Sequence, residues 1–230
     1  MRWVNRIAPA LAAAALLCSG CNLFGLGLYA IMAEKTRVVK AIYDLKPAAE
    51  KGRVMVIRVW ADPAIAGEHP YATLRTAKGL RAAFLKPESP LAKLRIKRPE
   101  SVEFFQQSQG GSDSLTPDEF AEHFKADIVL DVVLEEYTNL APGSQDLFQG
   151  RITAHLGLYE FSKGEDNQLP VDKRRLEVVF PDKPIDLRGG ETTQETIRAE
   201  LHRRFSDKVF RKFHDHEVPL SDPKGEYADE

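Results

Sequence analysis

The sequence predicts an α/β (α+β) fold: a mixed, partly parallel sheet of about five strands with helices packed on it. Three observations predict it. The run Val54–Trp60 is apolar and β-branched, as in a strand covered on both faces. Apolar residues then recur at helical spacing over 71–85. Two later segments, 126–134 and 150–161, alternate with the period of a strand.

The first half of the domain alternates strands with helices. After the first strand, the helix over 71–85 is expected to bury one stripe, formed by Tyr71, Leu74, Ala77, Leu80 and Phe84. A short strand over 94–97 and a helix over 100–107 follow, the latter with Pro99 in its first turn. This order favours parallel pairing through right-handed crossovers.

The next helix has the clearest start signal in the chain. Thr116 is the expected N-cap, Pro117 occupies the first helical position, and Glu119 completes a capping box. Leu115 and Phe120 stand at the two positions of a hydrophobic staple. We therefore predict a helix that begins at Pro117.

Strands dominate the next part, over 126–134, 150–161 and 171–180, with a long loop over Pro181–Gly190. The last helix begins at a capping box of Thr192 and Glu195 and reaches about His214. Its expected buried stripe is Ile197, Leu201, Phe205, Val209 and Phe213. The predicted order is β-α-β-α-α-β-β-β-α.

The N-terminus resembles a secretory signal peptide over 1–20. Arg2 and Arg6 precede the apolar segment Ile7–Leu17, and small residues follow it. The run Leu17-Cys18-Ser19-Gly20-Cys21 resembles the lipobox of bacterial lipoproteins, although Cys18 stands where leucine is usual. That resemblance implies an acylated Cys21 as the new N-terminus, with membrane lipid as its partner. Acyl chains anchor a domain because each buried CH₂ contributes about 0.8 kcal/mol.

An uncleaved helix is the alternative anchor. Ile7–Met32 is long enough to span a hydrocarbon core of about 30 Å, although three glycines weaken it. Either anchor places the rest of the chain across the membrane, in the cell envelope on the periplasmic or external side. The expected organisation is a signal peptide over 1–20, a lipid anchor and tether over 21–50, the α/β domain over 51–216 and a disordered acidic tail over 217–230.

Cysteine count and charge exclude several classes. Loss of Cys18 with the signal and acylation of Cys21 would leave no thiol for a disulfide, a nucleophile or a zinc site. Removing Arg2 and Arg6 takes the formal charge from −2 to −4, which is unlike a nucleic-acid-binding protein. The sequence contains no phosphate loop, dinucleotide fingerprint or nucleophile elbow, so we expect no cofactor and assign no catalytic residue.

Two groups of residues are weak candidates for chemistry. His214 and His216 alternate with Asp215 and Glu217, a pattern that suits a divalent metal, or equally a solvated helix end. We assign no metal ligand. Asp131 and Glu135 share one face of the expected strand, near His155. Four residues separate the two carboxylates by about 13 Å, whereas glycosidases require about 5–9.5 Å. Cross-strand pairing with Arg151 or His155 is the favoured role.

One basic run, Lys93, Arg95, Lys97 and Arg98, is typical either of an edge strand protected by charge or of contact with anionic envelope groups. Isolated histidines, His69, His123 and His202, are interpreted as surface or helix-face residues. The Ser221-x-x-Lys224 spacing lies in the predicted tail and includes Pro223, which argues against a helical catalytic motif.

The element order behind a lipobox resembles a class of bacterial envelope lipoproteins that includes the N-terminal domain of TolB, LpoB and CsgG. The matching features are the first strand and helix, the strand opening with Ala126-Asp127, and the strand opening at Gly150-Arg151. The run Phe148–Arg151 also resembles uncharacterised planctomycete-type lipoproteins. The resemblance covers 50–215 and implies a protein-interaction role with no cofactor. Without the extra segments of CsgG, a pore is not expected.

The sequence therefore favours a membrane-anchored, non-enzymatic module for protein interaction, assembly or regulation, with an envelope protein as partner and no nucleic acid. Two alternatives stay open. One is an envelope hydrolase that uses carboxylate and histidine groups on the sheet. The other is a carrier of lipid or a small ligand between helices and sheet.

Overall fold

The computed structural model describes residues 36–109, 115–161, 172–186 and 193–219, and the chain divides into two compact units. The larger unit is Lys40–His216. A separate two-stranded sheet is formed by β1, Thr36–Val39, and β7, His216–Pro219. None of the helices in the described ranges has the length and hydropathy of a membrane span. The predicted signal peptide, Cys21 and the region beyond 219 lie outside the described residues.

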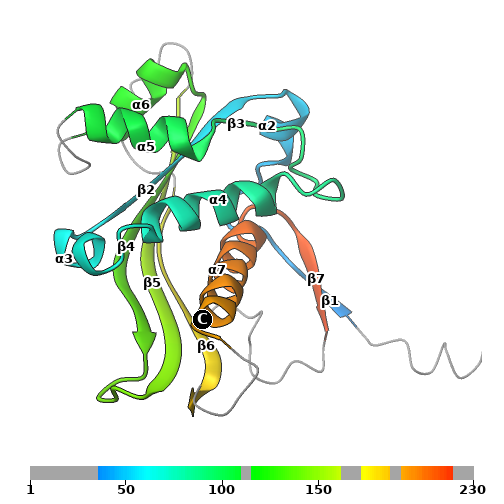
Figure 1. Ribbon diagram of the computed structural model, residues 1–230. Helices are drawn as coiled ribbons and strands as arrows, with labels where there is room; N and C mark the ends of the chain where they lie inside the picture. Colours follow the sequence, from blue (N-terminus) through cyan, green and yellow to red (C-terminus); the bar gives the residue numbers. More distant parts are fainter. Residues whose placement is uncertain (1–35, 110–114, 162–171, 187–192, 220–230) are drawn as a thin grey trace, which may run out of the picture. The chain divides into compact units, whose positions relative to one another are not determined.

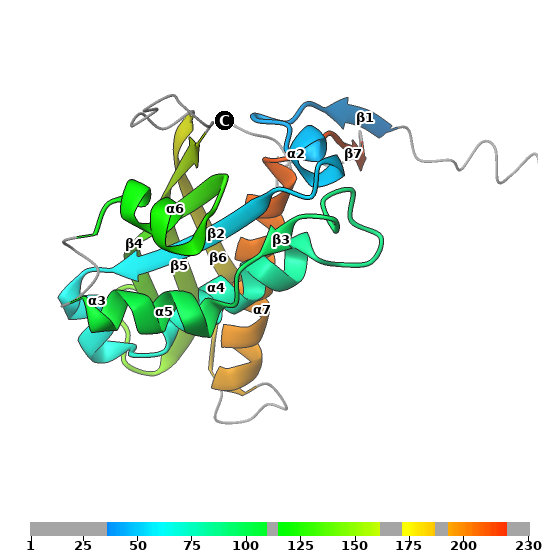
Figure 2. The ribbon, with the colours of Figure 1, turned by 90° about the horizontal axis from the view of Figure 1, so that it is seen from above.

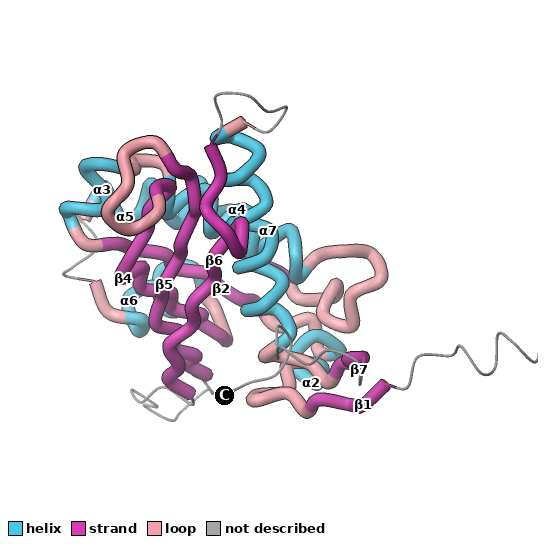
Figure 3. The backbone as a smooth tube through the Cα atoms, turned by 90° about the horizontal axis from the view of Figure 1, so that it is seen from below, coloured by secondary structure: helices cyan, strands magenta, loops and turns pink. Residues whose placement is uncertain are grey.

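A five-stranded sheet forms the centre of the larger unit and confirms the predicted fold class. Its strand order is β3-β2-β4-β5-β6, in which β3, β2 and β4 are mutually parallel, β5 is antiparallel to β4, and β6 is antiparallel to β5. Figure 3 shows β4, β5 and β6 side by side. The strands are β2 (Val54–Ala61), β3 (Arg95–Ile96), β4 (Ile128–Leu140), β5 (Leu147–Glu160) and β6 (Asp172–Asp186). The predicted order of strands and helices from 54 to 211 is also confirmed, with one additional short helix.

Helices cover the two faces of this sheet unequally. On one face, which we call the core face, α4 (Ala72–Phe84) and α7 (Gln194–Arg211) pack side by side (Figure 1). On the other, which we call the polar face, α6 (Pro117–Phe124) contacts β2 and β4. Figure 2 shows α4 and α6 on opposite sides of β2. The remaining helices are α2 (Lys46–Glu50), α3 (Pro63–Glu68) and α5 (Pro99–Ser108).

The helix α5 lies against β2 because β3 is too short to cover that edge. β3 pairs only with Val54 and Met55, which leaves the rest of β2 without a neighbouring strand on that side. Gln106 of α5 is buried, and its Nε2 donates to the Val59 carbonyl oxygen at 3.5 Å. The Gln106 side chain thus hydrogen-bonds a backbone carbonyl group that would otherwise lie at an open edge of the sheet.

Most of the core is the one that periodicity predicts. All five residues of the predicted α7 stripe are at most 3% exposed, and Ile128, Leu130, Val132 and Leu134 of β4 share the core face. In α4 the prediction is partly wrong. Tyr71 precedes the helix and is 67% exposed, and Leu74 is only half-buried. The buried positions of α4 are Ala72, Thr76, Ala77, Leu80, Ala83 and Phe84.

The predicted start of α6 is confirmed. The Thr116 backbone amide donates to Glu119 Oε2 at 2.6 Å, and both hydrogen bonds of the capping box are present. Leu115 and Phe120 are buried in the same cluster, as the staple predicts. For α7 the N-cap is Thr193, one residue later than predicted, and its side chain accepts from the Thr196 amide. The predicted cap Thr192 lies outside the described residues.

The strand β6 extends further than predicted. It continues through Pro181 to Asp186, where the sequence suggested a loop. Proline is tolerated there because β6 is the outermost strand and Pro181 falls in the irregular part of its pairing with β5, between the pairs Gly150–Phe180 and Phe148–Ile185. Proline therefore misleads the prediction at this position, since it argues against a central strand but not against an edge strand.

Two segments assigned to the tether and the tail contain ordered elements. Within Lys40–Glu50, Leu45 and Ala49 are fully buried, and the Leu45 amide donates to the Phe213 carbonyl oxygen at 3.1 Å. Tyr43 donates a hydrogen bond to Glu160 of β5. In the predicted tail, residues 217–219 belong to β7. The contacts of Tyr43 and Leu45 join segments that are far apart in the sequence, which local patterns do not show.

Candidate functional site

The polar face of the sheet carries the residues that the sequence singled out. Strand register places Val133 of β4 opposite His155 of β5, and His155 opposite Arg175 of β6. A β-bulge at Glu135 interrupts the register between Leu134 and Glu136. Such a bulge re-aims the side chain that it contains.

Glu135 joins the other two strands of this face. Its Oε1 lies 2.8 Å from His155 Nε2, and its Oε2 lies 2.9 Å from Arg175 Nε. The hydrogen bond from Arg175 lowers the pKa of Glu135 and raises that of Arg175. All three side chains are more than one third exposed, so solvent screens the interaction. The group is a surface network rather than a catalytic pocket.

A second charged pair, on the same face, is buried. Arg58 of β2 lies directly opposite Asp131 of β4, with its Nη1 3.3 Å from Asp131 Oδ1. The exposed fractions of the two side chains are 6% and 12%. The Arg58 guanidinium carbon also lies 5.8 Å from the centre of the Trp60 ring and 5.3 Å from that of Phe120. Burial raises the pKa of Asp131, while the charge of Arg58 opposes that shift.

A glycine makes room beside this pair. Gly157 of β5 lies opposite Asp131, and a Cβ atom there would come within 3.1 Å of the Tyr159 ring. The missing side chain therefore lets Tyr159 lie over the strand next to Asp131. Burial, followed by the Asp131 charge, raises the pKa of the Tyr159 hydroxyl.

The predicted carboxylate pair is thus placed in two unlike environments. Glu135 pairs with His155, which agrees with the role favoured by the sequence. Asp131 pairs with Arg58, whereas the sequence suggested Arg151 or His155 as partners of the two carboxylates. Arg151 instead contacts Glu177 at 2.9 Å and Glu136 at 3.7 Å. The sequence did not indicate Arg58, because a positive charge within an apolar strand has no visible partner until β2 and β4 are paired.

The other candidate group, His214 to Glu217, makes separate contacts. His214 is buried, and its ring packs on Phe210 with centroids 4.1 Å apart. Asp215 accepts from Lys40 Nζ at 2.7 Å and from the Ala41 amide at 2.9 Å. Burial lowers the pKa of both His214 and His216. In the described ranges, no three His, Cys, Asp or Glu residues are arranged to hold a metal ion.

Sequence reasoning missed one buried polar network. His202 of α7 was interpreted as a surface residue but is 7% exposed. Its Nε2 lies 3.0 Å from the Tyr137 hydroxyl, and its Nδ1 lies 3.3 Å from Thr76 Oγ1. Desolvation lowers the pKa of His202 to about 4. The available signal was its position, one residue after the buried Leu201.

Sequence reasoning also missed a surface groove between α5 and α6. The groove has a volume of about 470 Å³, within the about 300–1,000 Å³ range of ligand pockets. Phe104 borders it and is 73% exposed, while the Phe105 ring stacks on His123 at 3.9 Å. Its lining residues are Glu100, Ser101, Phe104, Phe105, Ser108, Gln109, His123 and Phe124. The adjacent residues Phe104 and Phe105 were the available sequence signal for an exposed ring, because a single helix cannot bury both rings on one face.

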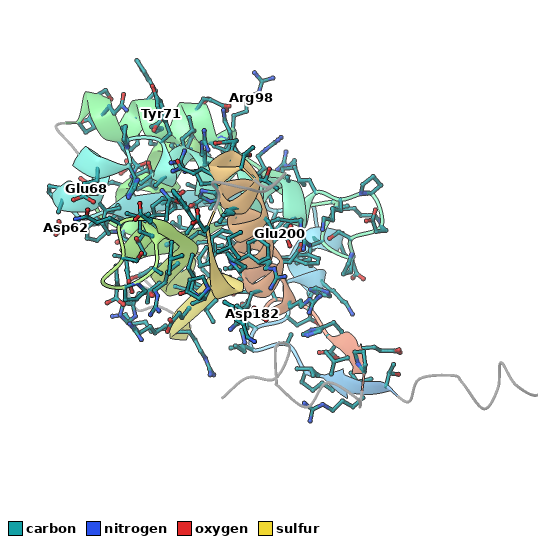
Figure 4. The ribbon with its side chains drawn as sticks, turned by 60° about the horizontal axis from the view of Figure 1, so that its bottom comes forward. Asp62, Glu68, Tyr71, Arg98, Asp182 and Glu200 are labelled. Atoms are coloured by element: carbon teal, nitrogen blue, oxygen red, sulfur yellow. The ribbon has the colours of Figure 1, made fainter. Side chains whose placement is uncertain are left out.

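The basic run lies at the opposite edge of the sheet from β6. β3, which contains Arg95, is the other outermost strand. Arg95 Nε donates to the Gly52 carbonyl oxygen at 2.7 Å, and Arg98 extends away from the ribbon (Figure 4). This placement agrees with charge at an edge strand, a feature that disfavours pairing with another chain.

No protein-family model matches the chain, and no curated protein matches it. Solved structures are similar to it at low identity. PelC from Paraburkholderia phytofirmans, described as a dodecamer, is 16% identical with a TM-score of 0.38, over 78% of this chain and 98% of that one. Lipoprotein GNA1162 from Neisseria meningitidis is 13% identical with a TM-score of 0.37, over 65% and 91%.

The C-terminal domain of LpoB from Salmonella enterica is 15% identical, with a TM-score of 0.32, over 59% of this chain and 95% of that one. The similar structures thus include a bacterial lipoprotein and one of the proteins named in the sequence resemblance. Likenesses this distant assign neither a family nor an activity. Membership of a TolB or CsgG class and a planctomycete-type origin stay predictions.

Proposed function

We propose that this protein is an envelope lipoprotein, anchored through an acylated Cys21, whose α/β unit acts as a non-enzymatic protein-interaction module. The observation that carries the proposal is the run Leu17-Cys18-Ser19-Gly20-Cys21 directly after an apolar segment preceded by two arginines. That arrangement is typical of an exported chain retained by lipid.

The geometry of the polar face favours interaction over hydrolysis. A hydrolase that uses carboxylates needs two of them to face one substrate site. Asp131 is buried against Arg58, whereas Glu135 lies at the surface with His155 and Arg175. Each candidate already has a partner, and the two differ in exposure. Neither the groove nor its lining includes any of them.

The alternative of a lipid carrier has little support from the packing of the helices on the sheet. The space between β2, α4 and α5 is about 10 Å³, close to the minimum for one water molecule. A lipid chain needs a far larger apolar cavity. The groove between α5 and α6 lies at the surface and suits a protruding side chain better than an enclosed lipid.

Mass spectrometry of the native N-terminus tests the anchor. We expect a mature chain that begins with acylated Cys21. A Cys21→Ser variant should lose acylation and leave the membrane fraction, whereas Cys18→Ser, the matched control, should keep both. A chain that retains Met1 and stays membrane-bound in both variants would favour the uncleaved helix instead.

Crosslinking in intact cells tests the interaction. A photoreactive residue at Phe104 should give a defined adduct with an envelope protein. The same residue at Tyr71, which is similarly exposed at 67%, is the control. The interaction proposal fails if the two positions give the same adducts, or if neither gives any when Cys21 is acylated.

A further inference from the structure

The groove between α5 and α6 combines exposed aromatic surface with carboxylates. Phe104 presents most of its ring to solvent, although aromatic side chains are usually buried. Beside it, Phe105 packs edge-on against Phe120 and Phe124 and stacks on His123. The floor of the groove is therefore formed by packed rings, and the exposed Phe104 forms its rim.

The charge of the two helices has one sign. Together α5 and α6 contain five carboxylates and neither lysine nor arginine; the carboxylates are Glu100, Glu103, Asp118, Glu119 and Glu122. Glu100 lines the groove and pairs with Lys78 of α4 at 3.0 Å. Glu119 serves the capping box, while Glu122 is exposed next to His123. Exposed aromatic rings beside the Glu100 carboxylate attract cations, and the ring faces add a cation–π contribution.

We propose that this groove docks a cationic amphipathic segment of an envelope protein, with an apolar side chain against Phe104 and Phe124 and lysine or arginine toward Glu100. This inference rests on the proposed function, since it names the surface and the partner chemistry of the interaction module. Charge complementarity selects the occupant: an acidic segment would meet Glu100 in the lining and the exposed Glu122 next to His123, and a purely polar one would leave the exposed ring in water.

Binding of designed peptides to the full acylated chain tests the proposal. The chain is placed in nanodiscs of zwitterionic phosphatidylcholine, and binding to empty discs is subtracted. The probe is a fluorescent Leu/Lys peptide with helical spacing of its leucines, compared with a Leu/Glu peptide of the same pattern. We expect the basic peptide to bind, and its affinity to fall as salt rises from about 0.05 to about 0.3 M, because screening shortens the reach of charges.

Two variants, each lacking one exposed aromatic ring, distinguish binding in the groove from non-specific hydrophobic binding. Phe104→Ser should weaken the basic peptide by about tenfold, the loss typical of one anchoring aromatic side chain. Tyr71→Ser removes a ring of similar exposure outside the groove and should leave the affinity within about twofold. Thermal unfolding of both variants verifies that they are folded. Equal losses in the two variants, or equal affinity for the acidic peptide, would overturn the proposal.

The failure of this inference differs from a failure of the proposed function. If Cys21 is acylated but the basic peptide ignores Phe104→Ser, the groove has been assigned wrongly and the lipoprotein proposal stands. If the native chain is unacylated yet Phe104→Ser and Tyr71→Ser still differ, the groove stands and the anchor does not.

Discussion

The two faces of the central sheet are built from alternate residues of the same strands, yet they are organised differently. The core face packs fully buried side chains from β2, β4 and β5 under α4 and α7. The polar face packs a smaller apolar cluster under α5 and α6 and otherwise carries charged pairs. Stability thus depends mainly on one face. Outside its buried ion pair, the other face carries exposed charged pairs such as Glu135 with Arg175.

Each face also contains one buried polar network, and these networks differ in charge. On the core face, His202 is neutral and shares hydrogen bonds with Tyr137 and Thr76. On the polar face, Arg58 and Asp131 form an ion pair beneath aromatic rings. A neutral network costs little to bury once its hydrogen bonds are made, whereas a buried charge depends on its partner. The four predictions below test the contrast between the two faces.

The largest effect is expected on the core face. Phe205 of α7 is fully buried in the main core cluster. Phe205→Ala should lower the free energy of unfolding by about 4 kcal/mol, because it removes a large apolar side chain and leaves a cavity. Urea unfolding followed by circular dichroism measures the change. Phe104→Ala, which truncates an exposed ring, should change it by no more than about 0.5 kcal/mol. Similar losses for the two would show that α7 does not seal the core.

The next largest effect is expected at the buried ion pair. Asp131→Ala leaves Arg58 charged in an environment where its side chain is 6% exposed. We expect a loss of about 3 kcal/mol, since a buried charge that loses its carboxylate counter-ion is strongly destabilised. The double variant Arg58→Met with Asp131→Leu should recover most of that loss. If the double variant is less stable than the single one, the pair contributes through packing rather than charge.

The third effect depends on pH. The pKa of His202 is lowered to about 4 when folded, against 6.5 for an ordinary histidine. Between these values the unfolded chain binds more protons, so stability is full above the unfolded pKa and falls as pH drops. From about pH 7 to about pH 5, His202 should cost about 2 kcal/mol. His202→Gln, which does not titrate, should reduce that loss; an unchanged pH profile would place His202 in solvent.

The buried carboxyl of the polar face makes stability depend on pH in the opposite direction. Burial raises the pKa of Asp131 above its ordinary 3.8. Between the ordinary pKa and the raised pKa of Asp131, the folded chain therefore binds more protons than the unfolded chain. The free energy of unfolding falls as pH rises through this range. Comparing wild type with His202→Gln cancels this contribution, because both chains keep Asp131.

Patterns within short segments predicted most of the fold. The stripe of α7, the capping box of α6 and the alternation of β4 and β5 are local signals, and the structure agrees with each. Partnerships between distant segments were not predicted. Leu45 pairs with backbone near Phe213, and Arg58 meets Asp131 only after β2 and β4 align. Single-sequence periodicity contains no information on such pairs.

The same limit applies to the candidate sites. The sequence placed Glu135 near His155, because adjacent antiparallel strands were predicted there, and the structure has that contact. It did not predict the groove, because the groove requires the packing of α5 on α6. The adjacent Phe104 and Phe105 show that one helix cannot bury both rings, but not which of them is exposed, since a phenylalanine at helical spacing is more often buried.

The smallest effect is expected at the exposed network of the polar face. Glu135→Gln removes the charge that joins His155 and Arg175, but all three side chains are largely in solvent. We expect the urea midpoint to move less than in Phe205→Ala or Asp131→Ala, and added salt to remove the difference, because exposed ion pairs are screened. Glu177→Gln, which breaks the neighbouring pair with Arg151, is the matched control. A loss as large as that of Asp131→Ala would mean that this surface is needed for folding, and it would no longer be free to serve recognition.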